Sequence, residues 1–306
     1  MGSARWSSNS WKSYSSTTST RSASAIFTKS SLHEDLNPTK FTVRESRDSD
    51  LNPNSTAIMV GVDVTGSMGR LADYFVKTGL GTLFGEILDR KPVSDPHLMV
   101  LAIGDVEYDS SPIQASQFEA DITITDQIEK IHVEHGGGGN SCESYDMPYY
   151  IAAHKTSIDC FEKRGKKGYL FTIGDEPPPV KTSKEHIAKF IGDTPQADVM
   201  FSDLIEQAQK MYHCYHIIVA EPSTYAGSRP DAVKKPWVEL LGQNVVVLTD
   251  STKLSEVIVS IMEVNEGRDV EDVASSWSGD TSLVVRSAVS GLSKSESASE
   301  TGIVRL

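Results

Sequence analysis

A carboxylate and two hydroxyls follow the first long apolar run of the chain at a regular spacing. Asp63 is followed by Thr65 at the second position and by Ser67 at the fourth, with Gly66 between the hydroxyls. Gly66 allows a tight turn, so the three side chains can face one point. Such oxygen ligands suit a hard cation, and Mg²⁺ takes near-octahedral oxygen coordination while keeping several waters. The alternative role for these side chains is to cap the helix that follows.

Acids also follow the other apolar runs of the chain. Five runs each end within two residues of a carboxylate: Asp63, Asp105, Asp175, Glu221 and Asp250. If the runs are parallel strands, their carboxyl ends meet at one edge of the sheet, where open α/β sheets bind ligands. Like charges brought together destabilise the fold unless something positive compensates, and a divalent metal is the simplest compensator. For Glu221 and Asp250, an ordinary loop or cap role is an equal alternative.

The elements that must position these acids alternate between apolar runs and helical patterns. Continuous apolar runs predict buried strands over residues 57–62, 97–103, 169–173, 215–220 and 245–248, and a weaker alternation predicts an edge strand over 118–124. Helical spacing predicts helices over residues 71–88, 126–133, 141–161, 184–191, 202–212, 233–241 and 254–266. Continuously apolar strands are covered on both faces. The sequence therefore predicts a three-layer α/β domain with a doubly wound, mostly parallel sheet.

The chain divides into three zones by composition. Residues 1–55 form a Ser/Thr-rich N-terminal extension, residues 56–266 hold all the long apolar runs, and residues 267–306 form a Ser-rich acidic tail. The N-terminal extension carries Trp6, Trp11 and Tyr14, which are more aromatic side chains than a flexible linker needs. We expect these side chains to dock on the domain or on a neighbouring subunit.

Charge and cysteine content narrow the classes of partner and compartment. The formal net charge of −13 disfavours nucleic acid and anionic membranes as partners. Three cysteines are too few for a disulfide framework, and an odd number would leave one of them unpaired. This cysteine content suits a reducing compartment. The chain has no apolar run long enough to span a bilayer and no signal core at its start. We expect a cytoplasmic protein of a bacterium, or a virion protein if a phage encodes it.

The apolar strand followed by Asp63-Val64-Thr65-Gly66-Ser67-Met68 resembles the metal-ion-dependent adhesion site of von Willebrand factor A domains. That family continues with a Thr in a later loop and an Asp after the fourth strand. Gly174-Asp175-Glu176 matches the last point, and the order of motifs matches over residues 56–266. The stretch from Gly104-Asp105 through the glycine-rich loop to Gly174 is similar to the divergent A domains found beside α-kinases and in matrix proteins.

The middle loop of the motif departs from the family pattern. His135 and the glycines 136–139 are followed by Asn140-Ser141-Cys142-Glu143, and no Thr follows the glycines. We expect Asn140 to supply the third ligand through its amide oxygen, with Ser141 or Glu143 as the alternatives.

The resemblance implies how the site would hold a cation. Thr65 and Ser67 would bind Mg²⁺, or else Mn²⁺ or Ca²⁺, directly, whereas Asp63 and Asp175 would act mostly through water. Asp105 and Glu143 would support these ligands from a second layer. One coordination position would stay open for a Glu or Asp of a partner protein.

The function implied is therefore a metal-dependent binding module rather than an enzyme. Stand-alone bacterial and phage proteins of this kind often work as adaptors for AAA+ ATPases of the MoxR type. The first alternative is a phage or virion assembly protein that self-assembles through its terminal arms. A metal-dependent hydrolase is a weaker alternative, because no nucleophile paired with a base can be identified in the sequence.

Three further chemistries are disfavoured by spacing. A dehalogenase-like phosphohydrolase needs a second carboxylate two residues after Asp63, where Thr65 stands. The glycine run lacks the Gly-Lys-Ser/Thr ending of a phosphate-binding loop. Zinc binding by the two histidine pairs is also disfavoured, because no Cys-x-x-Cys accompanies them: His132 with His135, and His213 with His216 and Cys214.

Overall fold

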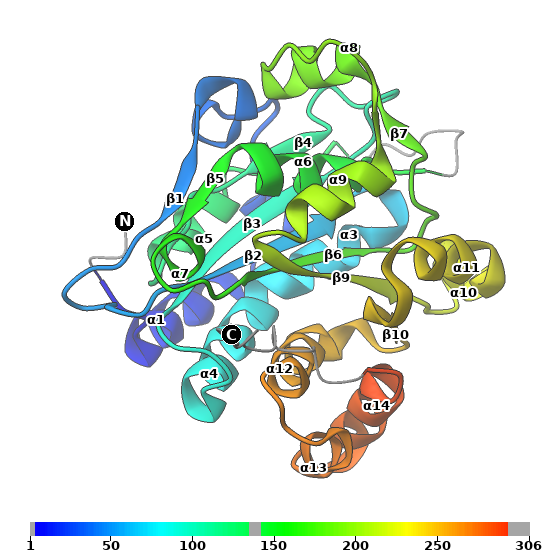
Figure 1. Ribbon diagram of the computed structural model, residues 1–306. Coiled ribbons are helices and arrows are strands. Elements are labelled where there is room, and N and C mark those ends of the chain that lie inside the picture. Colours follow the sequence, from blue (N-terminus) through cyan, green and yellow to red (C-terminus); the bar gives the residue numbers. More distant parts are fainter. Residues whose placement is uncertain (1–3, 135–141, 293–306) are drawn as a thin grey trace, which may run out of the picture.

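A six-stranded sheet crosses the middle of the molecule (Figure 1). The computed structural model describes residues 4–134 and 142–292, apart from the side chain of Ser67. The strand order is β10-β9-β6-β2-β3-β4, and every neighbouring pair is parallel except β3 with β4. The strands are β2 (Thr56–Asp63), β3 (Pro96–Ile103), β4 (Ile113–Ala115), β6 (Gly168–Gly174), β9 (Tyr212–Val219) and β10 (Val245–Leu248).

Helices cover both faces of this sheet, and each layer has its own apolar core. Along β2, Ile58, Val60 and Val62 face one core while Ala57 and Met59 face the other, as the two-residue period of a strand requires. The first core is covered by α3 (Gly69–Tyr74), the π-helical turn η4 (Phe75–Gly79), α4 (Leu80–Arg90), α12 (Leu254–Asn265), α13 (Val270–Ser275) and α14 (Gly279–Val289). The second is covered by α6 (Asp146–His154), α9 (Phe201–Ala208) and α11 (Pro230–Leu241). The predicted three-layer α/β fold with a mostly parallel sheet is confirmed.

The remaining elements are short and lie around this framework. They are α1 (Ser8–Thr18), α2 (Ala23–Ile26), η1 (Glu34–Leu36), η2 (Pro38–Lys40), β1 (Arg44–Ser46), η3 (Gly66–Met68), α5 (Thr123–Ile128), β5 (Thr156–Ile158), α7 (Asp159–Glu162), β7 (Lys181–Thr182), α8 (Lys184–His186), η5 (Ile187–Ile191), β8 (Val199–Met200), α10 (Tyr225–Ser228), η6 (Gly242–Asn244) and η7 (Ser251–Lys253).

Two predicted elements are wrong, and the helix predicted over residues 126–133 lies earlier, at α5. The edge strand is β4, upstream of residues 118–124, where only Glu119 bridges to Leu98. The Asp121 carboxylate accepts hydrogen bonds from the N–H and hydroxyl of Thr123, which begins α5 in place of an extended strand. The helix predicted over 141–161 is interrupted: α6 ends at His154, β5 follows, and α7 begins at Asp159. Residues 156–158 are extended because they pair with β1, which comes from a distant part of the chain.

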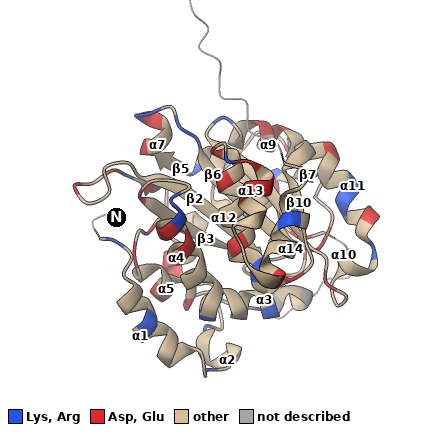
Figure 2. Ribbon diagram, turned by 90° about the horizontal axis from the view of Figure 1, so that it is seen from below, with Lys and Arg blue, Asp and Glu red and all other residues tan. Residues whose placement is uncertain are grey.

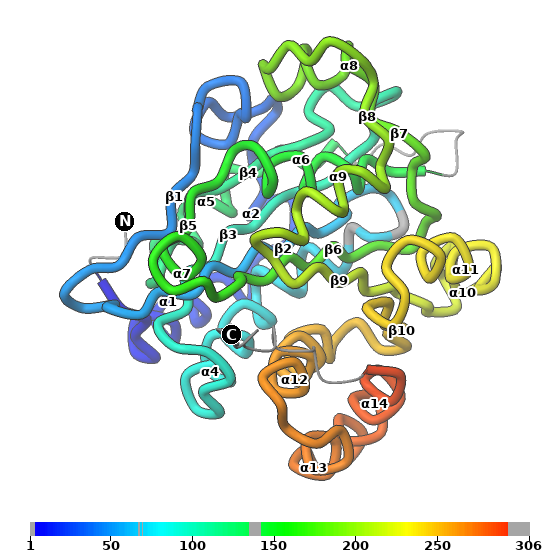
Figure 3. The backbone as a smooth tube through the Cα atoms, in the orientation of Figure 1, coloured from blue at the N-terminus to red at the C-terminus, as the bar shows by residue number. Residues whose placement is uncertain are grey.

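The first 55 residues pack against the domain. Trp6 stacks on Phe84 of α4 with 4.2 Å between ring centroids. Trp11 lies so close to Gly81 that a Cβ atom at Gly81 would meet its ring at 1.9 Å. Figure 3 shows β1 running beside β5, and their register pairs residues 44–46 with 156–158. The expected docking of the N-terminal aromatic side chains therefore occurs on the chain's own helices.

The tail beyond residue 267 also contributes helices to the fold. Trp277, after α13, donates a hydrogen bond from its indole to Ser260 Oγ of α12 at 2.8 Å. Arg90 of α4 stacks over the Trp277 ring at 3.5 Å. Figure 2 shows the basic residues visible from this side scattered over several helices rather than gathered in one stripe. Within the described residues, no helix combines the length and apolar character needed to cross a membrane.

Candidate metal site

The sheet topology brings three of the predicted acids to adjacent strand ends. β2 lies between β6 and β3, and Asp63, its last residue, pairs in register with Ile103. Asp105 lies two residues beyond Ile103, and Asp175 directly follows β6. The side chains of Asp63 and Asp175 are fully buried, and Asp105 is only 2% exposed. The carboxyl ends of three parallel strands therefore meet in one buried acidic region.

Asp63 is fully satisfied by hydrogen bonds from this chain. Its Oδ1 accepts from the backbone N–H of Thr65 at 2.9 Å and from the Thr65 hydroxyl at 2.7 Å. Its Oδ2 accepts from the Tyr145 hydroxyl at 2.8 Å. Because the Thr65 hydroxyl gives its proton to Asp63, its lone pairs remain available to a cation. This is the arrangement expected of an acid that acts from behind a hydroxyl ligand.

Tyr145 was not predicted from the sequence. It directly precedes α6 and is fully buried. Its hydroxyl donates a hydrogen bond to Asp63 at the end of β2 and lies beside the end of β6. A Cβ atom at Gly174 would lie 2.0 Å from that hydroxyl, so only glycine fits at the last position of β6. The only sequence signal was an aromatic residue near the glycine-rich loop, which does not distinguish this role from core packing.

Three carboxylate oxygens in this region are buried and accept no hydrogen bond within the described residues. They are Asp105 Oδ2, Glu143 Oε2 and Glu176 Oε2. Glu143 is 5% exposed and lies within hydrogen-bond reach of the Thr65 hydroxyl. Glu176 was not predicted as a site residue, although its position directly after Asp175 was a usable signal.

The electrostatics of these acids are unfavourable without a counter-ion. Burial and then the charges of Asp63, Glu176 and Asp105 raise the pKa of Glu143 well above its usual range. Burial and then the charges of Asp63, Asp175 and Asp105 raise the pKa of Glu176 to about 7. Burial also raises the pKa of Asp63, against the hydrogen bonds from Thr65 and Tyr145. The charges that act most strongly on these three groups are those of other carboxylates.

Of the other predicted ligands, the structure describes Asp175 but not the side chains of Ser67, Asn140 and Ser141. Asp175 is held at the edge by the N–H of Tyr225, which donates to its Oδ2 at 2.7 Å. Ser67 lies in η3, four residues after Asp63, but its side chain is outside the described part of the structure. Asn140 and Ser141 also lie outside the described residues, so the choice of third ligand stays a prediction.

Glu221 and Asp250 have ordinary loop and capping roles, which the sequence allowed as the alternative to cation binding. Glu221 Oε1 accepts a hydrogen bond from the N–H of Ser251 at 2.6 Å. Asp250 is the N-cap of η7, and its carboxylate accepts from the N–H of Thr252 at 3.0 Å. Both acids therefore stabilise the turns that follow β9 and β10. Of the five acids predicted at strand ends, only the three at the ends of β2, β3 and β6 lie in the buried acidic region.

The donor set of the buried region fits a hydrated divalent cation. It combines the hydroxyl oxygen of Thr65, whose proton goes to Asp63, with buried carboxylate oxygens that accept no hydrogen bond from the described residues. Such oxygens are hard ligands for Mg²⁺ or Ca²⁺. In the described part of the chain, no three His, Cys, Asp or Glu side chains are arranged to hold a metal by themselves. A cation here would therefore depend on hydroxyls and water as well as on acids.

His216 of β9 belongs to the core rather than to a zinc site. His216 is fully buried, stacks on Trp237 with 3.5 Å between ring centroids, and hydrogen-bonds Thr172 through Nδ1 at 2.9 Å. Burial holds the pKa of His216 well below its usual range, so this imidazole stays neutral.

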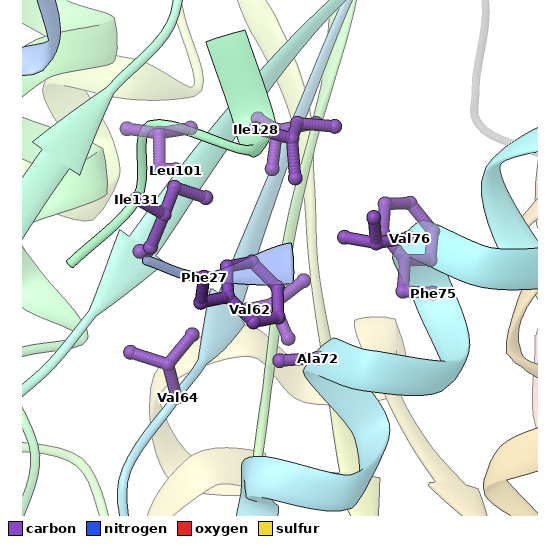
Figure 4. A pocket seen from close by; sticks show the side chains of 11 residues that line it. Phe27, Val62, Val64, Ala72, Phe75, Val76, Leu101, Ile128 and Ile131 are labelled. Atoms are coloured by element: carbon purple, nitrogen blue, oxygen red, sulfur yellow. The ribbon is translucent and has the colours of Figure 1, made fainter. Parts of the chain in front are cut away.

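An apolar cavity of about 20 Å³ lies behind the motif loop (Figure 4). Val62 and Val64, which flank Asp63, line it together with Ala72 and Ile131. Phe27, from the N-terminal extension, also lines it. An apolar space of this size stays dry, so the motif loop is backed by hydrocarbon and polar only toward the acids.

No family model and no curated protein sequence matches the chain. Solved structures that are similar include a von Willebrand factor type A protein from Catenulispora acidiphila, at 14% identity and a TM-score of 0.38, covering 71% of this chain and 44% of that one. The open form of the pilus adhesin SpaC from Lactobacillus rhamnosus GG is similar at 11% identity and a TM-score of 0.43, covering 73% of this chain and 31% of that one.

A conserved hypothetical protein, BatB from Bacteroides thetaiotaomicron, is similar at 9% identity and a TM-score of 0.40, covering 68% of this chain and 98% of that one. This chain thus spans less than half of the length of the first two proteins. The likeness is one of fold at low identity.

Proposed function

We propose that this chain is a binding module that holds a divalent cation where β2, β3 and β6 end, and that the cation binds a carboxylate of a partner protein. The supporting observation is the hydrogen-bond pattern of Asp63. Both of its oxygens are occupied by Thr65 and Tyr145, which leaves the Thr65 hydroxyl oxygen free as a direct ligand. A cation bound mainly by neutral hydroxyls and water keeps its attraction for an external carboxylate.

The surrounding charge supports the same proposal. The acids of this region repel one another, and burial makes each negative charge more costly. A divalent cation would relieve that repulsion, so binding it would stabilise the fold. We propose Mg²⁺ as the ion, with Mn²⁺ as an experimental substitute and Ca²⁺ as the competitor.

Calorimetric titration of Mg²⁺ and Mn²⁺ into the full chain tests the proposal. Asp63→Ala removes the acid that orients Thr65, and we expect metal affinity to fall by about 10- to 100-fold. Asp250→Ala is the matched control, because Asp250 lies at the same edge but caps η7. Equal heats for wild type and Asp63→Ala would overturn the proposal.

We propose a binding role rather than hydrolysis, since hydrolysis also requires a nucleophile paired with its base. Among partner classes, an AAA+ ATPase is the first to test, by metal-dependent co-purification with wild type and Asp63→Ala. The competing role in virion assembly relied on terminal arms that reach other subunits. Trp6 and Trp11 instead pack on α4 of their own chain, which favours the binding module.

A further inference from the structure

Glu176 is held by its backbone from two sides. Its N–H donates to the Tyr145 hydroxyl at 3.4 Å, and its carbonyl accepts from the indole N–H of Trp237 at 3.0 Å. Both aromatic side chains are fully buried, and they contact each other edge-to-face with 5.6 Å between centroids. The peptide of Glu176 is therefore fixed against the core.

The chain on either side of Glu176 restricts it further. Asp175, before it, is fully buried and accepts a hydrogen bond from Tyr225. Pro177, Pro178 and Pro179 follow it, and proline fixes φ near −65°. The Cα atom of Glu176 therefore has a fixed position next to the acids at the strand ends.

The Glu176 carboxylate lies among acids and has no partner within the described residues. Its Oε2 is buried and accepts no hydrogen bond. The charges of Asp63, Asp175 and Asp105 act on it, and its own charge acts on Glu143. A buried carboxylate oxygen among other acids is stable only with a proton or a cation beside it.

We propose that Glu176 is an internal ligand of the bound cation, occupying the coordination position that a partner's carboxylate would take. The inference rests on the proposed function above. A partner must then displace Glu176, so the chain restrains its own binding site until a competing carboxylate arrives. Glu176 is suited to this exchange because it is only half-buried, whereas Asp63 and Asp175 are fully enclosed.

The test uses Mn²⁺ as the probe and the full chain as the protein. Calorimetry measures affinity, and water-proton relaxation counts the waters bound to Mn²⁺. We expect Glu176→Gln to weaken Mn²⁺ binding by about tenfold or more and to add one bound water. Glu107→Gln is the matched control: it removes the same charge two residues after Asp105, from a side chain that is 61% exposed. We expect it to bind Mn²⁺ like wild type.

Glu176→Asp separates ligation from simple attraction. It keeps the charge but withdraws the carboxylate by one methylene, so a ligand role predicts weaker binding and an extra water. A long-range electrostatic role predicts wild-type behaviour in this variant. Circular dichroism and thermal melting verify that both variants fold.

The outcomes distinguish this inference from the proposed function. If wild type binds Mn²⁺, Asp63→Ala does not, and both Glu176 variants match wild type in affinity and hydration, then only the inference on Glu176 is wrong. If wild type and Asp63→Ala give equal heats, the proposed function fails, and with it the role of Glu176. Acetate should displace water from Mn²⁺ at lower concentration in Glu176→Gln than in wild type, and equal displacement would also count against the inference.

Discussion

The two edges of the central sheet treat buried acids in opposite ways. At the edge where β2 and β6 begin, Asp159 accepts from Arg47 at 2.8 Å and Lys163 at 2.6 Å, and Arg164 pairs with Asp48 at 2.6 Å. At the edge where these strands end, Asp105, Glu143 and Glu176 each keep a buried oxygen with no hydrogen bond in the described part of the chain.

The pKa values follow this difference in partners. Burial alone would raise the pKa of Asp159, but hydrogen bonds from Lys163, the Asp48 backbone and Arg47 outweigh it and lower the pKa to about 2. Burial and then the charges of Asp63, Asp175 and Asp105 raise the pKa of Glu176 to about 7, because no cationic side chain among the described residues offsets them. An acid with cations beside it stabilises the fold, whereas a group of acids without them is a site for an external cation.

The largest expected effect is on the metal-free protein when Asp63 is neutralised. Asp63→Asn keeps the side-chain volume and removes one buried negative charge. We expect a higher melting temperature than wild type in EDTA at pH 8, and loss of the stabilisation that saturating Mg²⁺ gives to wild type. The measurement is thermal unfolding with and without Mg²⁺; a fall in melting temperature in EDTA would mean that the acids do not repel one another as described.

The acids at the two edges should affect the stability of the fold in different pH ranges. Glu176 has a folded pKa of about 7, above its unfolded value, so its contribution falls as pH rises from about 4.5 through 7. Asp159 has a folded pKa of about 2, below its unfolded value, so its contribution is lost as pH falls through 2. Melting temperatures measured in EDTA from pH 2 to 9 should therefore decline toward both the acid and the alkaline end.

Mg²⁺ should flatten only the alkaline side of that profile. Cation binding favours the deprotonated acids at the strand ends, whereas the Asp159 pairs contain no metal ligand. A uniform upward shift at every pH would contradict the assignment of the cation to this edge.

A smaller effect is expected at the paired edge. Arg47→Ala removes one partner of the buried Asp159 but leaves Lys163, so we expect a loss of about 1–3 kcal/mol in the free energy of unfolding. Urea denaturation measures it, and Mn²⁺ affinity should not change. A change in Mn²⁺ affinity would mean that the two edges are coupled.

The smallest effect is expected for Asp250, an acid that lies at the metal edge but serves as a cap. Asp250→Ala should cost about 0.5–1 kcal/mol of stability, within the usual range for an N-cap. The substitution removes the hydrogen bond from the N–H of Thr252. Urea denaturation measures the resulting change in the free energy of unfolding. A gain in stability would place Asp250 with the repelling acids instead.

The N-terminal segment shows where the local sequence pattern does not predict the secondary structure. The first 55 residues lack a sustained hydrophobic period, yet α1 and β1 form there. β1 is extended because residues 156–158 pair with it, more than 100 positions away. α1 is held by Trp11, which packs against Gly81 of α4 and beside Trp6. Neither partner can be identified from a local pattern, since both contacts arise only after the chain has folded.

The amino-acid sequence alone determined the layer architecture, because buried parallel strands and their covering helices leave hydrophobic patterns in every local stretch. It also placed Asp63, Thr65, Asp105 and Asp175 at strand ends, where a parallel sheet gathers them. Only the tertiary structure decided that Asp250 caps a helix while Glu176 Oε2 accepts no hydrogen bond within the described residues. Those roles depend on which N–H groups and side chains arrive from distant elements, and spacing along the chain carries no information about such contacts.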